Sequence, residues 1–233
     1  MVKFFKKNIL ISIILVFAIF IVISYIITKD MPELFRYAED IYNVLFQLSI
    51  GYIISFVFYV LQVYIPNVKQ TKYTNDCINS RLFTIISKME ELFTRISKLY
   101  LKRNDIENFS SEDFLNLFRS IKQNDYTSAL KPDRMGTEKE HYTVKEWILY
   151  CVEYIEHEID AIYKYYPLYI DSDLMKHLES ILNSGMHKSM ARLYLQIPPE
   201  NCPFDKAESE TFFSSYYNLE NELKFLLNKR KGG

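Results

Sequence analysis

Two long apolar runs occupy the first third of the chain. Residues 9–27 are apolar except for Ser12, Ser24 and Tyr25, and a second run covers residues 41–65. At a rise of about 1.5 Å per residue, each run is long enough for a helix that crosses a hydrocarbon core of roughly 30 Å. Only residues 28–40 connect them. The pattern predicts a transmembrane hairpin in residues 1–66, with helices at about 9–27 and 41–65.

The first run differs from a cleaved signal peptide in two respects. It is longer than the apolar core of a signal, and the residues after it, Thr28-Lys29-Asp30-Met31-Pro32, contain no small-x-small cleavage site. The second apolar run, which follows after a short loop, fits a hairpin better.

Basic residues predict how the hairpin is oriented. Six flank the two runs on one side, and two lie in the connecting loop, so the positive-inside rule predicts that both termini are cytoplasmic. Few glycines together with abundant Lys, Asn, Ile and Tyr suggest an AT-rich bacterial gene, and hence the bacterial inner membrane. The six flanking residues are Lys3, Lys6, Lys7, Lys69, Lys72 and Arg81, against Lys29 and Arg36 in the loop.

The second run carries polar and small residues along one stripe. At about 100° per residue, its members fall within a sector of roughly 120°. Uncovered amides are costly in hydrocarbon, and small residues let helices approach closely. The stripe therefore either packs against the first helix or a sister subunit, or lines a pore formed by several copies. Its members are Asn43, Gln47, Gly51, Ser55 and Gln62.

A heptad pattern follows the hairpin in residues 67–103. Apolar residues recur at alternating spacings of four and three, which predicts a helix-packing seam on a stem helix. Neighbouring apolar residues widen the stripe, which favours a bundle helix or a higher-order coil over a two-stranded one. Whether the seam pairs within or between chains stays open. The seam is Ile78, Leu82, Ile85, Met89, Leu92, Ile96 and Leu99.

Two expectations concern the junction between the hairpin and this stem. Pro66 is expected to break or kink the second membrane helix, because proline lacks an N–H and clashes with the preceding turn. The seam register, counted backwards, is expected to continue into the membrane helix through Val68, Tyr64, Leu61, Val57 and Ile54.

Residues 104–233 predict a cytoplasmic helical domain. Ser110 with Asp113 is a capping box that opens a short helix to about Gln123, and Thr143 with Glu146 caps the next helix. Asp171 or Ser172 caps a further helix. Residues 186–196 and 206–229 predict two more helices. Residues 124–142 are expected to be irregular, and no segment shows a clear strand period. The fold class is therefore all-α, with a bundle of about five or six helices.

Charge and cysteine content limit the possible partners. Residues 66–103 have a net charge of +5 and residues 104–233 of −7, so a basic stem, which suits an anionic inner leaflet, precedes an acidic domain. No segment has the concentrated positive charge of a nucleic-acid binder. Three widely spaced cysteines form no disulfide framework and indicate a reducing compartment.

The sequence contains no recognisable catalytic or cofactor motif. Glu153, Glu156, His157 and Asp160 share one helix, but no second helix offers the matching ligands of a di-metal site, so surface pairing is the simpler interpretation. The five glycines are scattered, which disfavours a phosphate-binding loop. We expect no enzyme activity, cofactor or metal.

Tyrosines gather around Pro167. They could offer stacking faces to a flat ligand, or pack on the edge of the core with their hydroxyl groups in water. The cluster is Tyr163, Tyr165, Tyr166 and Tyr169.

The stretch from Leu48 to Pro66, LSIGYIISFVFYVLQVYIP, carries a resemblance. Together with the short anchor, the basic heptad stem and a helical domain without catalytic motifs, it resembles small bacterial two-transmembrane effectors of retron and other anti-phage abortive-infection systems. The resemblance implies that activation assembles the membrane helices and breaches the bilayer, with the soluble domain as sensor.

Three functional hypotheses follow. The first is an oligomerising, membrane-disrupting effector that is switched by a cytoplasmic partner or ligand. The second is a passive membrane scaffold or recruitment module, and the third is a membrane-tethered enzyme. The expected partners are the lipid bilayer, further copies of the chain and a cytoplasmic protein, with no nucleic acid.

Overall fold

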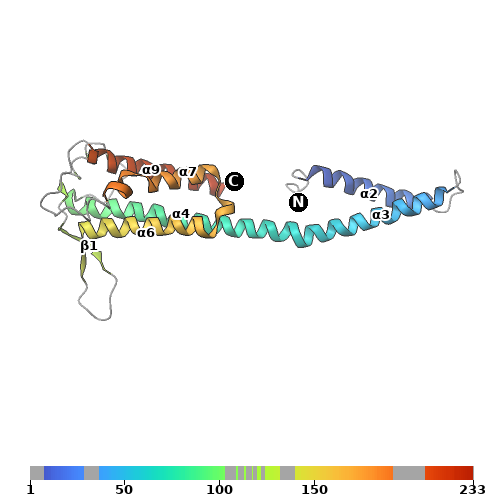
Figure 1. Cartoon of the computed structure of the whole chain (residues 1–233), viewed down its shortest axis with the longest axis horizontal. Coiled ribbons are helices and arrows are strands. Elements are labelled where there is room, and N and C mark those ends of the chain that lie inside the picture. The colour runs from blue at the N-terminus through green and yellow to red at the C-terminus, as the bar shows by residue number, and fades with distance from the viewer. Residues whose placement is uncertain are drawn as a thin grey trace. The chain divides into compact units, whose positions relative to one another are not determined.

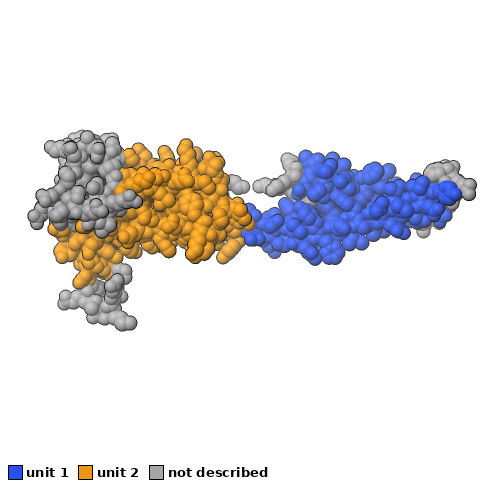
Figure 2. All heavy atoms as spheres, viewed as in Figure 1, with its two compact units in different colours: residues 1–72 blue, residues 73–233 orange. Residues whose placement is uncertain are grey.

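The chain is predominantly helical, as the sequence predicts (Figure 1). The computed structural model describes residues 8–28, 37–102, 124–131, 140–190 and 208–232, with single positions at 109, 113, 117, 120 and 121. The helix expected over residues 110–123 and the stretch 191–207 lie largely outside the described residues. The chain divides into two compact units, residues 1–72 and 73–233 (Figure 2). The longer helices are α2 (Ile9–Thr28), α3 (Ala38–Tyr59), α4 (Ile65–Tyr100), α6 (Val144–Tyr165), α7 (Ser172–Leu182) and α9 (Glu208–Gly232).

In the first unit, α2 packs against α3. Ala18 and Ser49 are buried where the two helices meet, as expected for small residues at a close approach. The ring of Tyr25 stacks on Phe46 at a centroid distance of 4.2 Å. The Tyr52 hydroxyl donates a hydrogen bond to the carbonyl of Ile11 at 2.9 Å. Polar groups therefore hold the two apolar helices together.

Two described helices are long and apolar enough to cross a membrane. They are α2 and the continuous helical run from Ala38 to Tyr100. Only 6% of the most apolar 18-residue window of each is buried within the chain, whereas a core helix of a soluble protein is mostly buried. Their apolar side chains thus lie on the outside, where a hydrocarbon solvent suits them.

Pro66 does not break the helix. A π-helical turn, η1 (Val60–Tyr64), directly precedes α4, and the N–H of Ile65 donates to the carbonyl of Val60. This widened turn adds a residue to the helix, so the chain passes through the proline without a break. The added residue also shifts the phase of the apolar pattern. Within one chain the backward extension of the seam is not buried, because Ile54, Val57, Leu61 and Val68 are exposed and Tyr64 is half-buried.

The second unit has one apolar core, with α4 lengthwise beside α6, and α7 and α9 covering them (Figure 1). From Ile78 to Ile96, the six seam residues are buried in this core within a single chain. Leu99, the seventh, is 37% exposed. The second unit begins at Tyr73, so most of the expected stem is a bundle helix. The core residues that meet the seam include Ile148, Val152, Ile155 and Ile159 of α6, Leu174, Leu178 and Ile181 of α7, and Tyr216 and Leu223 of α9.

Residues 124–142, expected to be irregular, contain a small antiparallel sheet. Strand β1 (Tyr126–Leu130) pairs with β2 (His141–Thr143), with Tyr126 opposite Thr143. Thr127 and Ala129 point inward and their neighbours outward. The expectation of no strand is therefore wrong at this point. A run of five residues with Thr, Ser and Ala at its centre is too short and too weakly apolar to reveal its period.

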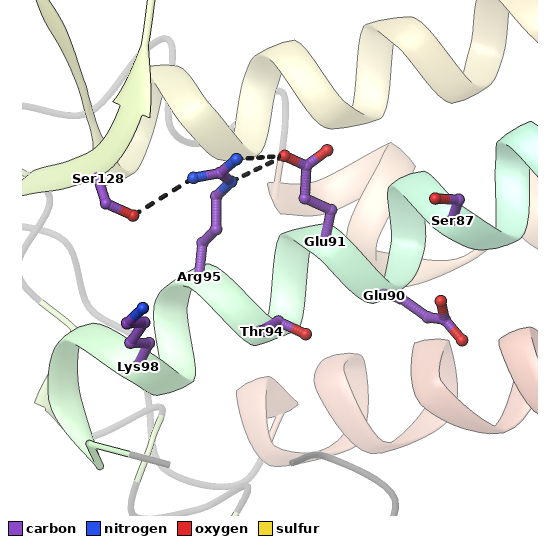
Figure 3. A pocket seen from close by; sticks show the side chains of 7 residues that line it. All are labelled: Ser87, Glu90, Glu91, Thr94, Arg95, Lys98 and Ser128. Carbon is purple, nitrogen blue, oxygen red and sulfur yellow. Dashed lines mark hydrogen bonds and ion pairs between the residues drawn. The ribbon is translucent and has the colours of Figure 1, made fainter. Parts of the chain in front are cut away.

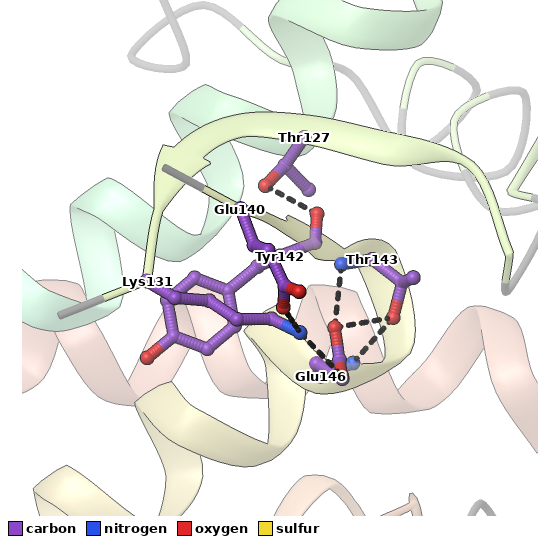
Figure 4. Close-up of polar contacts among 6 residues, drawn as sticks. All are labelled: Thr127, Lys131, Glu140, Tyr142, Thr143 and Glu146. Atoms are coloured by element: carbon purple, nitrogen blue, oxygen red, sulfur yellow. Dashed lines mark hydrogen bonds and ion pairs between the residues drawn. The ribbon is translucent and has the colours of Figure 1, made fainter. Parts of the chain in front are cut away.

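The two predicted N-caps that lie within the described residues, at Thr143 and at Asp171, are both present. The Thr143 hydroxyl accepts from the N–H of Glu146, whose carboxylate accepts from the N–H of Thr143, which completes the capping box of α6 (Figure 4). The Asp171 carboxylate caps α7 by accepting from the N–H of Leu174 at 2.8 Å. Lys131, just after β1, reaches Glu146 at 2.9 Å and so ties the sheet to the start of α6 (Figure 4).

Candidate functional sites

The polar stripe, which runs along α3 and into η1, mostly faces away from α2. Asn43 is the exception, since its Oδ1 accepts from the Tyr25 hydroxyl at 2.7 Å. Gln47, Ser55 and Gln62 are exposed within the chain. A Cβ added at Gly51 would meet no atom within 4 Å. Packing against the first helix therefore accounts for Asn43 alone, and the other four positions of the stripe point outward.

The exposed amides determine what this surface can do. The amide side chain of glutamine carries two N–H donors and a carbonyl acceptor, which are costly to leave without partners in hydrocarbon. Because Gln47 and Gln62 lie outside the α2–α3 contact, their partners in a membrane have to be a second protein surface or water. The alternatives left for the stripe are contact with a sister subunit and the lining of a pore.

The four tyrosines around Pro167 differ in their surroundings, although the rings of Tyr165 and Tyr166 meet edge-on at 6.4 Å. Tyr163, Tyr166 and Tyr169 are half-buried and pack against the core, and the Tyr163 hydroxyl donates to the carbonyl of Met175. Tyr165 instead projects into solvent with the ammonium group of Lys164 5.3 Å from its ring centroid. This arrangement matches the alternative in which the tyrosines pack on the edge of the core.

A buried polar network in the bundle was not found from the sequence. The imidazole of His187, on the π-helical turn η3 (Met186–Met190), lies between α6 and α9. Its Nδ1 is 3.0 Å from a carboxylate oxygen of Glu156, and its Nε2 is 2.9 Å from the Tyr216 hydroxyl. Burial lowers the pKa of His187 despite the carboxylate. The neutral ring then donates a hydrogen bond from Nδ1 to Glu156, and its Nε2 accepts one from the Tyr216 hydroxyl.

A second part of this network lies one turn further along α9. Lys224 contacts the buried Glu220 at 2.8 Å and Glu90 of α4 at 2.5 Å. The other oxygen of Glu220 has no hydrogen-bond partner in the described part of the chain. Burial raises the pKa of Glu220 against the effect of Lys224. Glu220 follows Tyr216 by four residues and so shares its inward face, and this spacing is the signal that sequence reasoning overlooked.

Cation–π contacts join α4 to α6. The Lys88 ammonium lies 5.2–5.4 Å from the ring centroids of Trp147, Tyr150 and Tyr154, and Glu91 pairs with it at 2.6 Å. The aromatic faces and the carboxylate together compensate a partly buried charge. These contacts hold the two helices together.

The open hollow beside α4 has no preformed ligand site. It measures about 380 Å³ and is lined mainly by polar residues of α4 together with Ser128 of β1 (Figure 3). Arg95 pairs with Glu91 at 2.7 Å and also donates to Ser128, while Glu90 pairs with Lys224. Glu90, Glu91 and Arg95 thus have partners within the chain that a ligand would have to displace, whereas Lys98 of the lining is exposed.

The described ranges contain no metal-binding group and two free cysteines. No group of three or more His, Cys, Asp or Glu side chains there could hold a metal ion. Glu153 and His157 both face solvent, as expected for a surface pair. Cys77 and Cys151 are free thiols, and burial raises the pKa of Cys151 well above its ordinary value, so this thiol stays protonated.

Comparison with known proteins returns no relative: no family model, curated protein or solved structure matches the chain.

Proposed function

We propose that the protein is a two-pass protein of the bacterial inner membrane that acts as an oligomerising, membrane-disrupting effector in anti-phage defence. The observation that carries the proposal is the outward-facing stripe of Gln47, Gly51, Ser55 and Gln62 in an otherwise apolar helix. The defence setting follows the resemblance to two-transmembrane effectors described above.

The stripe favours assembly for a physical reason. A single hairpin in lipid leaves the amides of Gln47 and Gln62 uncovered, whereas copies that bring their stripes together satisfy them by mutual hydrogen bonds or by a shared water path. Gly51 lets the backbones approach closely. Assembly thus stabilises the inserted protein. Where the stripes share a water path, the assembly also opens the bilayer.

The bundle supports a role as the regulated part. Its seam is buried within one chain, so the bundle needs no second copy to complete its core. In the proposal it binds an activating cytoplasmic protein and catalyses no reaction itself.

Both termini lie in the cytoplasm, so a reporter that is active only in the cytoplasm works after Gly233, and a reporter that is active only outside works between residues 29 and 40. The reverse pattern overturns the topology.

Replacing the stripe amides tests the proposal. Gln47→Leu with Gln62→Leu should leave expression and membrane localisation intact, because leucine inserts at least as well, but should abolish depolarisation and dye entry. Gly51→Leu should do the same. Because a Cβ at Gly51 meets nothing in its own chain, loss of activity in that variant reports contacts between chains.

A matched control uses exposed apolar positions that lie off the stripe. Ile41→Leu with Val57→Leu changes two such residues of the same helical run and should retain full activity. A wild-type protein that never depolarises the membrane, even with its genetic neighbours and an infecting phage, overturns the effector and leaves a passive scaffold. Equal depolarisation by wild type and the double leucine variant shows that the stripe is not the working surface.

A further inference from the structure

One end of the bundle exposes large apolar side chains. Tyr73 at the start of the second unit is 71% exposed, Tyr165 at the end of α6 is 60% exposed, and Leu168 is 91% exposed. Leu168 lies in the short 3₁₀ turn η2 (Pro167–Tyr169). A leucine held so far out of the core leaves its whole side chain to an outside partner.

Polar contacts bring these segments to the same end of the bundle. The guanidinium group of Arg230, near the end of α9, donates to Asn75 and Asn79 of α4, each at 3.2 Å. It also pairs at 2.6 Å with Asp171, which directly precedes α7. Arg81 of α4 pairs with Glu158 of α6, also at 2.6 Å. The first turns of α4 in this unit, the end of α6 with η2, and the end of α9 therefore meet.

Few residues separate this end of the bundle from the apolar run of the hairpin. Tyr73 follows Ile65, the last residue of the apolar run, by eight residues of the same helix α4. Eight helical residues span about 12 Å, which is no more than the depth of a headgroup layer and its adjoining water. The opposite end of the bundle carries another exposed aromatic residue, Tyr126 of β1. Along α4 that end is about 40 Å further away, since Tyr100 contacts Asp125 next to β1.

The charges at this end suit an anionic surface. Two of its acidic residues, Asp171 and Asp173, are engaged by Arg230 and Lys229, whereas Asp76 of α4 is exposed beside Tyr73. Lys164 and Lys231 instead lie over aromatic rings, at 5.3 Å from Tyr165 and 5.8 Å from Phe83. Exposed Lys69 and Lys72 precede the unit on α4. Tyrosine rings with lysine side chains are typical of the membrane interface, where the ring enters the headgroup layer and the ammonium contacts lipid phosphate.

We infer that this end of the bundle is a second membrane-contact surface, which docks on the anionic inner leaflet with Tyr73, Tyr165 and Leu168 in the headgroup region. The inference rests on the membrane insertion contained in the proposed function, but not on pore formation. Docking holds the bundle against the inner leaflet. A partner that detaches the bundle from the lipid therefore converts the docked protein into an undocked one.

Tryptophan substitutions in the full chain test the docking. The protein has one native tryptophan, Trp147, which is buried near the start of α6, at the other end of that helix from Leu168. Leu168→Trp, Tyr126→Trp and Leu48→Trp are each placed in nanodiscs that contain brominated lipids, with or without phosphatidylglycerol. All three native side chains are exposed, so the substitutions leave the core unchanged.

Docking predicts a clear order of quenching. Leu48→Trp should be quenched in both lipid mixtures, Leu168→Trp mainly when phosphatidylglycerol is present, and Tyr126→Trp no more than the wild type. Adding Lys164→Glu and Lys231→Glu to Leu168→Trp should lower its docked fraction relative to the undocked one by about tenfold or more, because each lysine is attracted to the anionic surface.

Failure of lipid docking and failure of membrane insertion give different quenching results. If Leu48→Trp is quenched and Leu168→Trp behaves like Tyr126→Trp, docking is wrong while insertion holds. If Leu48→Trp is not quenched, insertion fails, and the proposed function fails with it. A blue-shifted but unquenched Leu168→Trp means that a protein surface covers this end, and this result also overturns docking on lipid.

Discussion

The two units use similar apolar residues in opposite ways. In α2, Ala18 is the one buried residue, and most of the Ile, Val and Phe side chains are exposed. In α4, the buried residues recur every three or four positions, and polar residues occupy the other face. A helix that is apolar on all sides suits lipid, whereas a helix with an apolar stripe suits an interface with water. The difference shows which solvent each unit is built for.

Polar groups are also placed differently in the two units. The bundle buries His187 and Glu220 and supplies partners for them from Glu156, Tyr216 and Lys224. The hairpin leaves Gln47 and Gln62 on its outer surface with no partner from α2. A protein core and a bilayer each penalise an unpaired polar group. Apart from one oxygen of Glu220, the bundle pairs these groups within one chain, whereas the proposed membrane hairpin requires partners outside itself.

The largest expected effect comes from placing a charge in the core of the bundle. Leu92→Asp should cost several kcal/mol, because an unpaired carboxylate is buried where a fully covered leucine stood. The second unit should lose its cooperative thermal transition, measured by circular dichroism in detergent. Leu99→Asp, one heptad later at an exposed position, is the matched control and should melt like the wild type. A stable Leu92→Asp protein that only becomes smaller would show that the seam joins subunits instead.

A smaller effect is expected at His187. His187→Gln should cost about 1–3 kcal/mol at neutral pH, since Glu156 or Tyr216 loses a partner. Burial holds the pKa of His187 below its ordinary value of about 6.5, so on acidification the unfolded chain takes up a proton that the folded chain does not. Through this histidine, stability falls as the pH drops below about 6.5.

The pH dependence isolates this residue. The raised pKa of Glu220 acts in the opposite direction, since it makes the bundle less stable as the pH rises above about 4.5. That contribution is shared by the wild type and His187→Gln. The melting temperature of the wild type should therefore fall more, or rise less, than that of the variant between pH 7.5 and 5.0. The exposed control His157→Gln should keep the wild-type slope. Parallel slopes for wild type and His187→Gln contradict the assignment.

At the start of α6, Thr143→Ala should destabilise the bundle by about 1 kcal/mol, the typical effect of losing an N-cap. The change removes the hydroxyl that accepts from the Glu146 N–H and leaves the Lys131–Glu146 pair in place. Chemical denaturation of the full chain measures it. Thr143→Ser, which keeps the hydroxyl, should match the wild type, and equal losses in both variants would mean that the methyl group matters instead.

The smallest effect is expected inside the hairpin. Tyr25→Phe removes the hydroxyl that donates to Asn43, and hydrogen bonds between membrane helices average about 0.6 kcal/mol. Gln47→Leu, four residues further along and outward-facing, should not weaken the α2–α3 pair at all. Unfolding of the inserted protein by denaturant in bicelles compares the two. A larger loss for Gln47→Leu than for Tyr25→Phe would place Gln47, not Asn43, against α2.

Regular and local features could be predicted from the sequence. The bounds of α2, the caps at Thr143 and Asp171, and the six buried positions from Ile78 to Ile96 depend on hydrophobic period and on side chains that bond to their own turn. Such interactions join residues within a few positions of each other, so the order of residues is enough to specify them.

Only the tertiary structure decided the rest, because it depends on residues far apart in the chain. The contacts of His187 join residues 29 and 31 positions away, and no spacing rule brings these together. The outward direction of the polar stripe depends on which face of α3 the first helix covers, and Asn43 differs from Gln47 in that respect alone. The π-helical turn before Pro66 adds a residue that the hydrophobic pattern does not reveal, and with this turn the helix continues through the proline.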